Sequence, residues 1–240
     1  MVRVQSGVQL NENDVKVIIN EYVTRLLKGY KHNKVNGAKV IHDSVHGTNI
    51  FYPYEIAFLD LPIVQRLRRI SQTDVASLVF PAGNHNRFEH TVGTTVVAGQ
   101  MINSIFDRCH IDLPDVSKDF IYNNCRVAAI LHDCGHGPYS HLSEQLYSKQ
   151  FKFIKQNNPV LTGANAHEIL SYFIVTSDSL KNFNKNIIKK YYNVEIDLDF
   201  VGKMIVGYIN KRTRKNLGFA TEIMYTSNSG GIISSFKHNI

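Results

Sequence analysis

The sequence lacks an apolar run long enough to cross a membrane, and no apolar core follows its first residues. Neither a membrane span nor a signal peptide is therefore expected. Cysteine is scarce as well. The three cysteines, Cys109, Cys125 and Cys134, are odd in number and lack zinc-finger spacing. This usage predicts a reduced, cytoplasmic protein. Repeats and low-complexity tracts are also missing, so the 240 residues predict one large domain or one domain with a small extension.

The charge balance is basic, with 27 Lys and Arg against 20 Asp and Glu, which gives a formal net charge of +7. A solvated basic surface is the simplest explanation. The functional alternative is an anionic substrate bound by Arg66, Arg68, Arg69 and Arg87. A second basic run at 211–215 has no interleaved aromatic residues of the kind that stack single-stranded bases. Nucleic acid is therefore an alternative partner that is not favoured.

Apolar periodicity predicts a mostly α-helical chain. The first helix is expected to be capped by Asn13 or Asp14 and to end near Gly29, before a polar linker. Its apolar face is expected to consist of Val17, Ile18, Val23, Leu26 and Leu27. Residues 1–38 are accordingly expected to form an N-terminal helical extension and linker. Two short β-rich segments flank Gly47 and predict a small hairpin.

The most informative stretch runs from His132 to His141 and reads HDCGHGPYSH. Histidine and aspartate are side chains that bind divalent metals through nitrogen and oxygen. Because adjacent residues do not share a helical face, His132 and Asp133 can converge on one ion only where a helix ends. The glycines and Pro138 predict that a helix ends here.

A second cluster lies upstream at 84–90 and follows a turn signal at 80–83. Arg87 and His90 are three residues apart, which places them on one face of a helix. An arginine one turn from a metal ligand suits a phosphate that bridges the two groups. Alone, either cluster is equally well explained as a surface arginine and a core histidine. Together, the two clusters favour a metal site.

These stretches belong to an ordered series of motifs at 41–47, 65–72, 80–90, 132–141 and 165–168. In this order they resemble the HD-domain metal-dependent phosphohydrolases, in particular the deoxynucleoside triphosphate triphosphohydrolase branch. The resemblance covers about positions 39–235. It implies a mostly α, HD-domain helical fold with one small β-hairpin, in which residues 39–240 form the phosphohydrolase domain.

The resemblance also implies roles for the residues of both clusters. His90, His132 and Asp133 match metal ligands of the family, and Arg87 matches a residue that contacts a phosphate. Gln72 matches the residue that recognises the sugar 3′-hydroxyl. The neighbours of Gln72, at 73–74, depart from the usual apolar-glycine pair, which puts the sugar side of the site in question.

Four further residues match the catalytic group of the family. His136, His141 and His167 would line the binding site for the triphosphate. Among them, His141 matches the candidate proton donor to the leaving oxygen. Glu168 would orient His167 or His136.

The C-terminal end departs most from the family pattern. An ungapped match places Ile240 where the last metal-binding aspartate belongs, so the C-terminal end of the domain is expected to be incomplete. Three protein ligands in place of four predict weaker metal binding and poor hydrolysis.

The expected function is metal-dependent hydrolysis of dNTPs to nucleoside and tripolyphosphate. The cofactor would be a divalent ion, either Mn²⁺, Mg²⁺, Fe²⁺ or Zn²⁺. One alternative is a degenerate HD protein that binds metal or nucleotide with little turnover. Another is an HD phosphodiesterase or nuclease that acts on oligonucleotides. Self-association is a further expectation from the resemblance.

Overall fold

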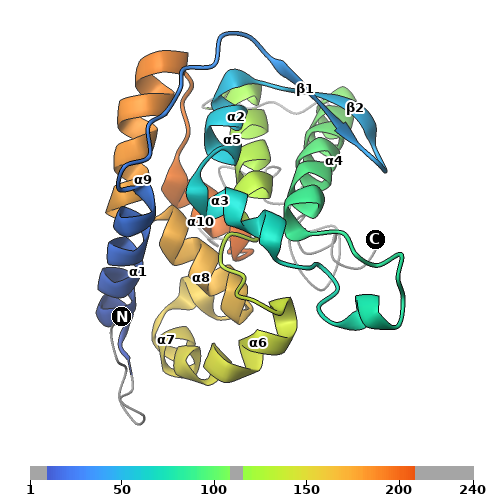
Figure 1. Ribbon diagram of the computed structural model, residues 1–240. Helices are drawn as coiled ribbons and strands as arrows, with labels where there is room; N and C mark the ends of the chain where they lie inside the picture. The colour runs from blue at the N-terminus through green and yellow to red at the C-terminus, as the bar shows by residue number, and fades with distance from the viewer. Residues whose placement is uncertain (1–9, 109–115, 209–240) are drawn as a thin grey trace.

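A computed structural model describes residues 10–108 and 116–208 of the chain. The described residues are mostly helical, with helices grouped around α5 and a hairpin at one end (Figure 1). The hairpin pairs β1 (Lys39–Asp43) with β2 (Gly47–Phe51) in antiparallel register, with Val40 opposite Ile50. The mostly α fold with one small hairpin is therefore confirmed for this part of the chain.

The remaining elements follow the chain in a simple order. The α-helices are α1 (Glu12–Leu27), α2 (Pro53–Leu59), α3 (Pro62–Gln65), α4 (Arg87–Arg108), α5 (Lys118–Leu131), α6 (Ser140–Tyr147), α7 (Phe151–Asn157), α8 (Ala166–Val175), α9 (Asp178–Phe183) and α10 (Leu198–Ile205). Short 3₁₀ turns are η1 (Arg66–Arg69), η2 (Ala76–Leu78), η3 (Ser148–Gln150) and η4 (Pro159–Leu161), and η5 (Asn184–Tyr192) is a π-helix.

Side-chain caps explain where several helices begin. Asn11 caps α1 and forms a reciprocal capping box with Asp14. The expected cap at Asn13 or Asp14 was therefore two or three residues too late. Val17, expected on the apolar face of this helix, is 58% exposed, whereas Val15 and Val23 are buried.

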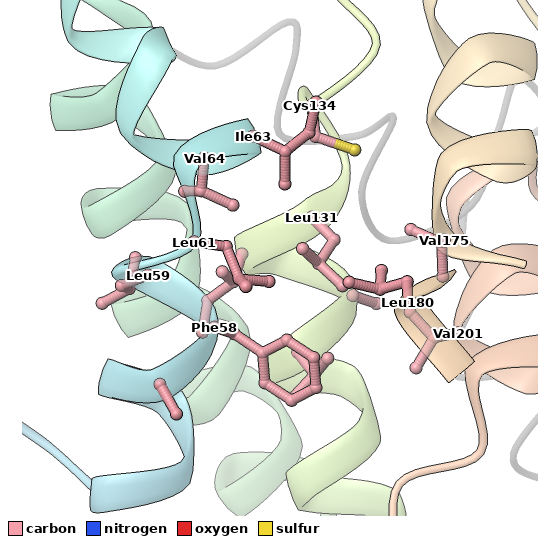
Figure 2. Packing of buried hydrophobic residues seen from close by; sticks show 14 of the residues in the cluster. Phe58, Leu59, Leu61, Ile63, Val64, Leu131, Cys134, Val175, Leu180 and Val201 are labelled. Atoms are coloured by element: carbon pink, nitrogen blue, oxygen red, sulfur yellow. The ribbon is translucent and has the colours of Figure 1, made fainter. Parts of the chain in front are cut away.

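The hydrophobic core surrounds the C-terminal half of α5. Leu131 and Cys134 lie between the α2–α3 segment on one side and helices α8 to α10 on the other (Figure 2). Residues that share this core include Phe58, Leu61, Ile63, Val64, Val175, Leu180 and Val201. Burial raises the pKa of the Cys134 thiol to about 12, so this thiol stays protonated and apolar at neutral pH.

A buried ion pair also fixes α5 against its neighbours. Arg126 of α5 donates to Glu55 of α2, and both side chains are buried. The same guanidinium donates to the Thr95 carbonyl of α4 at 3.2 Å. Because unpaired buried charges are costly, this pair restricts how α2, α4 and α5 can be arranged.

The turn that follows α5 packs directly against α8. The Gly135 N–H donates to Ser171 Oγ at 2.9 Å, and this hydroxyl donates to the His132 carbonyl at 2.6 Å. A Cβ at Gly135 would collide with backbone atoms of His167 and Ser171. Only glycine allows this approach, which brings the residues after α5 beside the first turn of α8.

In residues 10–108 and 116–208, no helix has the length and apolar character needed to cross a membrane. The basic run at 211–215 and the terminal residue Ile240 lie outside the described residues.

The close approach at Gly135 predicts a large stability effect. Replacing Gly135 with alanine should lower the free energy of unfolding by about 3 kcal/mol, because the backbone of α8 must move away. Gly163 is a matched control, since a Cβ there meets no atom within 4 Å. Urea denaturation of both variants measures the difference, and equal midpoints for the two would contradict this account of the turn.

Candidate metal centre

The candidate metal centre forms where α4 begins and α5 ends. His90 lies in the first turn of α4, and His132 is the residue at the C-terminal cap of α5. The two Nε2 atoms are 3.3 Å apart, and the His132 Nε2 is 3.2 Å from Asp133 Oδ1. One ligand atom from each of His90, His132 and Asp133 lies within 4.8 Å of the others. The structure therefore brings these three residues together.

The orientation of His132 suits a metal ligand. Its Nδ1 lies 2.7 Å from the Ala129 carbonyl, which can only accept a hydrogen bond. A proton on Nδ1 leaves the Nε2 lone pair directed toward His90 and Asp133. Two imidazole nitrogens and one carboxylate fit a borderline divalent ion such as Zn²⁺, Fe²⁺ or Mn²⁺.

Burial keeps two histidines beside Asp133 neutral. It lowers the pKa of His90 to about 4, with a smaller contribution from the nearby His132. It lowers the pKa of His136 to about 3, although contact with Asp133 acts in the opposite direction. Neutral imidazoles have the lone pair that metal binding requires.

Asp133 is the charged group at the centre of these contacts. Burial alone would raise its pKa, but His132, His136 and Arg87 together hold the pKa well below its usual range. The Arg87 Nη1 donates to Asp133 Oδ2 at 2.6 Å. The carboxylate is therefore ionised and bridges the two motifs found in the sequence.

Arg87 is only 1% exposed, which excludes the explanation of this residue as a surface arginine. Its Nε donates to Ser140 Oγ at 2.6 Å. Its remaining nitrogen, Nη2, is buried and finds no hydrogen-bond partner in residues 10–108 and 116–208. A buried guanidinium N–H without an acceptor is costly, and an anionic oxygen would satisfy it.

A second cluster, the histidine cluster, lies next to this centre and consists of His136, His141, Glu144 and His167. The rings of His136 and His167 stack with centroids 3.9 Å apart. His141 Nδ1 lies 3.2 Å from Glu144 Oε1, and His167 Nδ1 forms a shorter hydrogen bond with the same oxygen. These histidine contacts lower the pKa of Glu144 against the opposing effect of burial, so its carboxylate is ionised.

Glu144 was not among the site residues predicted from the sequence. The signal that was available is its position three residues after His141, which places both on one face of α6. Glu168, the carboxylate expected to orient His167 or His136, lies 3.9 Å from His167 Nε2. Its other oxygen accepts from the Asn165 N–H at 2.6 Å in the capping box of α8.

Gln72 belongs to neither cluster, but the two residues before it accept hydrogen bonds from Arg87 and Ser140, which lie beside the clusters. Its neighbour Ser71 accepts a hydrogen bond from Ser140 through the backbone carbonyl at 2.6 Å. The Gln72 Oε1 is buried and has no hydrogen-bond partner among the residues that the structure describes.

Two arginines expected near an anionic substrate have partners within the protein. Arg66 donates to the Cys134 carbonyl, and the Arg68 guanidinium lies 3.6 Å from the centre of the Phe88 ring. Both arginines thus have an internal partner, although the Nε of Arg66, like the Nη2 of Arg87, is buried without a hydrogen-bond partner within the described residues.

The chain is similar to known proteins over most of its length. It is 31% identical over 173 residues to the deoxynucleoside triphosphate triphosphohydrolase SAMHD1 of Bos taurus, which covers 70% of this chain and 27% of that protein. The same enzyme of Homo sapiens is 28% identical over 82% of this chain and 29% of its own length. An uncharacterised protein of Methanocaldococcus jannaschii is 32% identical over 72% of this chain and 31% of its own length.

The chain thus spans less than a third of the length of these relatives. Residues 87–196 match the HD-domain family, and this range contains every member of the metal centre and of the histidine cluster. HD domains are metal-dependent, and the group formed by His90, His132 and Asp133 is able to hold such an ion. The chain is therefore an HD-domain protein with homologues among the dNTP triphosphohydrolases.

Proposed function

We propose that the chain hydrolyses dNTPs to nucleoside and tripolyphosphate at the centre formed by His90, His132 and Asp133. The observation that carries this proposal is Arg87, a buried guanidinium whose Nη1 holds Asp133 and whose Nη2 has no hydrogen-bond partner within the described residues. A triphosphate oxygen is a suitable acceptor for this nitrogen. The SAMHD1 relatives are deoxynucleoside triphosphate triphosphohydrolases, which supports this class of substrate.

The metal would be held by the two imidazoles and the carboxylate of the centre. When bound, a divalent ion supplies a water of lowered pKa and offsets negative charge on the phosphate. Arg87 positions the phosphate chain and stabilises the charge that develops during hydrolysis. Gln72 would accept a hydrogen bond from the sugar through its unpaired Oε1.

The histidine cluster supplies the proton. In the proposed reaction a water attacks the α-phosphorus, the bond to the nucleoside O5′ breaks, and that oxygen takes a proton from His141. The His141 side chain is 57% exposed, and its Nδ1 faces Glu144. Glu144 is a positioning residue, because it fixes the rings of His141 and His167 through their Nδ1 atoms.

The test of this function is a product analysis. The purified chain is incubated with each dNTP in the presence of Mn²⁺, Mg²⁺ or Fe²⁺, and anion-exchange chromatography separates tripolyphosphate, pyrophosphate and phosphate. We expect nucleoside and tripolyphosphate in equal amounts, and loss of both in Asp133→Ala. A labelled single-stranded oligonucleotide serves as the competing substrate.

Three results would contradict the proposal. Cleavage of the oligonucleotide without dNTP hydrolysis would establish a phosphodiesterase or nuclease. Metal binding without turnover of any substrate would establish a degenerate HD protein. Equal activity of Asp133→Ala, with metal still bound, would mean that the centre lies elsewhere.

The two carboxylates near His167 give a second prediction. Glu144→Gln should lower kcat by about 10- to 100-fold with little change in KM, because the imidazoles lose their ionised acceptor. Glu168→Gln is the matched control, since glutamine also serves in a capping box. Steady-state kinetics measures both variants. A larger loss of kcat in Glu168→Gln than in Glu144→Gln would instead show that Glu168 positions the imidazoles.

A further inference from the structure

The histidine cluster has the composition of a metal site in its own right. It contains three imidazoles and one carboxylate, and one ligand atom from each residue lies within 4.8 Å of the others. These residues come from three separate elements. His136 follows α5, His141 and Glu144 lie one turn apart on α6, and His167 lies in the first turn of α8. The donors therefore surround one point from several directions.

Two of the three separations between Glu144 Oε1 and the ring nitrogens are close to the ligand spacing around a tetrahedral ion. Glu144 Oε1 is 3.2 Å from His141 Nδ1 and 3.8 Å from His136 Nδ1, and it is hydrogen-bonded to His167 Nδ1. Four ligands at the zinc bond lengths of proteins would stand roughly 3.3 to 3.5 Å apart. Binding of one ion requires side-chain rotations that lengthen the contact between His167 and Glu144 and bring together the ligand atoms that lie farther apart, all of which are within 4.8 Å of one another.

His136 gives an independent indication that this site takes a ligand. Its ring is almost completely buried, yet neither ring nitrogen satisfies the geometry of a hydrogen bond within the described residues. Its contacts with Asp133 and Glu144 are long, at 3.4 Å and 3.8 Å. Buried polar atoms without partners are rare and indicate a missing ligand or water.

We propose that the histidine cluster binds Zn²⁺, with His136, His141, His167 and Glu144 as its ligands, and that this zinc inhibits the enzyme. Three nitrogens and one oxygen select zinc or copper over Mg²⁺, which prefers oxygen ligands. The exposed His141 gives the ion a route from solvent. Zinc binding rests on the cluster alone, whereas the inhibition rests on the proposed function.

Inhibition follows because zinc and the proposed reaction use the same imidazole nitrogens of the histidine cluster. A zinc ion on the cluster occupies the imidazoles that would otherwise contact the triphosphate and give the proton to the leaving oxygen. The metal centre formed by His90, His132 and Asp133 remains available to its own ion. Zinc at this second position therefore stops turnover without displacing the metal of the first.

The test first measures binding, apart from activity. Equilibrium dialysis against Zn²⁺ counts bound ions, and Co²⁺ substitution reports tetrahedral coordination through its visible spectrum. The His90→Ala variant removes a ligand of the metal centre and should still bind one zinc with a tetrahedral cobalt spectrum. The double variant His90→Ala/His141→Ala should lose both signals. Because His141 is exposed, this change should leave the fold intact, which circular dichroism verifies.

A matched control and a second variant complete the design. His42, which lies on β1 and belongs to neither cluster, is replaced by alanine in the same His90→Ala background and should leave zinc binding unchanged. Glu144→Gln in that background should also abolish the site. A His90→Ala protein without tetrahedral cobalt, or equal zinc binding after loss of His141, would overturn the proposal.

Activity is measured separately. With Mn²⁺ present, added Zn²⁺ should abolish tripolyphosphate release, and a chelator followed by fresh Mn²⁺ should restore it. Zinc on the cluster with unchanged activity would overturn the inhibition. Zinc binding in a chain that hydrolyses no dNTP would leave the site established and would reject the proposed function instead.

Discussion

The carboxylate of Asp133 is the group on which the arrangement of the site depends. A buried negative charge must be surrounded by donors or cations, because removing it from water is expensive. Asp133 is buried at the end of α5, and its two oxygens face Arg87 and three imidazoles. Satisfying this one charge therefore joins the first turn of α4 to the turn after α5 and links the metal centre to the histidine cluster through His136.

The turn before α6, which has a strained backbone at Tyr139 and Ser140, also supports the arrangement of the site. Tyr139 and Ser140 have φ values of 59° and 44°, a region that residues with side chains seldom adopt. The Ser140 hydroxyl donates to the Ser71 carbonyl and accepts from Arg87. These hydrogen bonds offset the local strain and direct α6 so that His141 and Glu144 face His167. The position of the histidine cluster is thus set by the same arginine that holds Asp133.

Local sequence signals were sufficient to predict part of the metal centre. Glycines and a proline indicated that a helix ends at His132, and the spacing of Arg87 and His90 indicated a shared helical face. Local signals did not reveal Glu144, because its role depends on how α6 packs against α8. Val17 shows the same limit, since periodicity alone cannot say which turn of α1 faces the core. The fold class followed from patterns within elements, whereas contacts between elements required the structure.

The directions of α4 and α5 have a consequence for how ligands bind together. The N-terminal end of α4 and the C-terminal end of α5 meet at the metal centre. Aligned peptide dipoles give a helix a partial positive charge at its N-terminus and a partial negative charge at its C-terminus. The end of α5 therefore attracts a cation, and the start of α4 attracts an anion. The partial charges at these two helix ends favour the simultaneous binding of a metal ion and a polyphosphate. Each ligand is therefore expected to raise the affinity of the centre for the other.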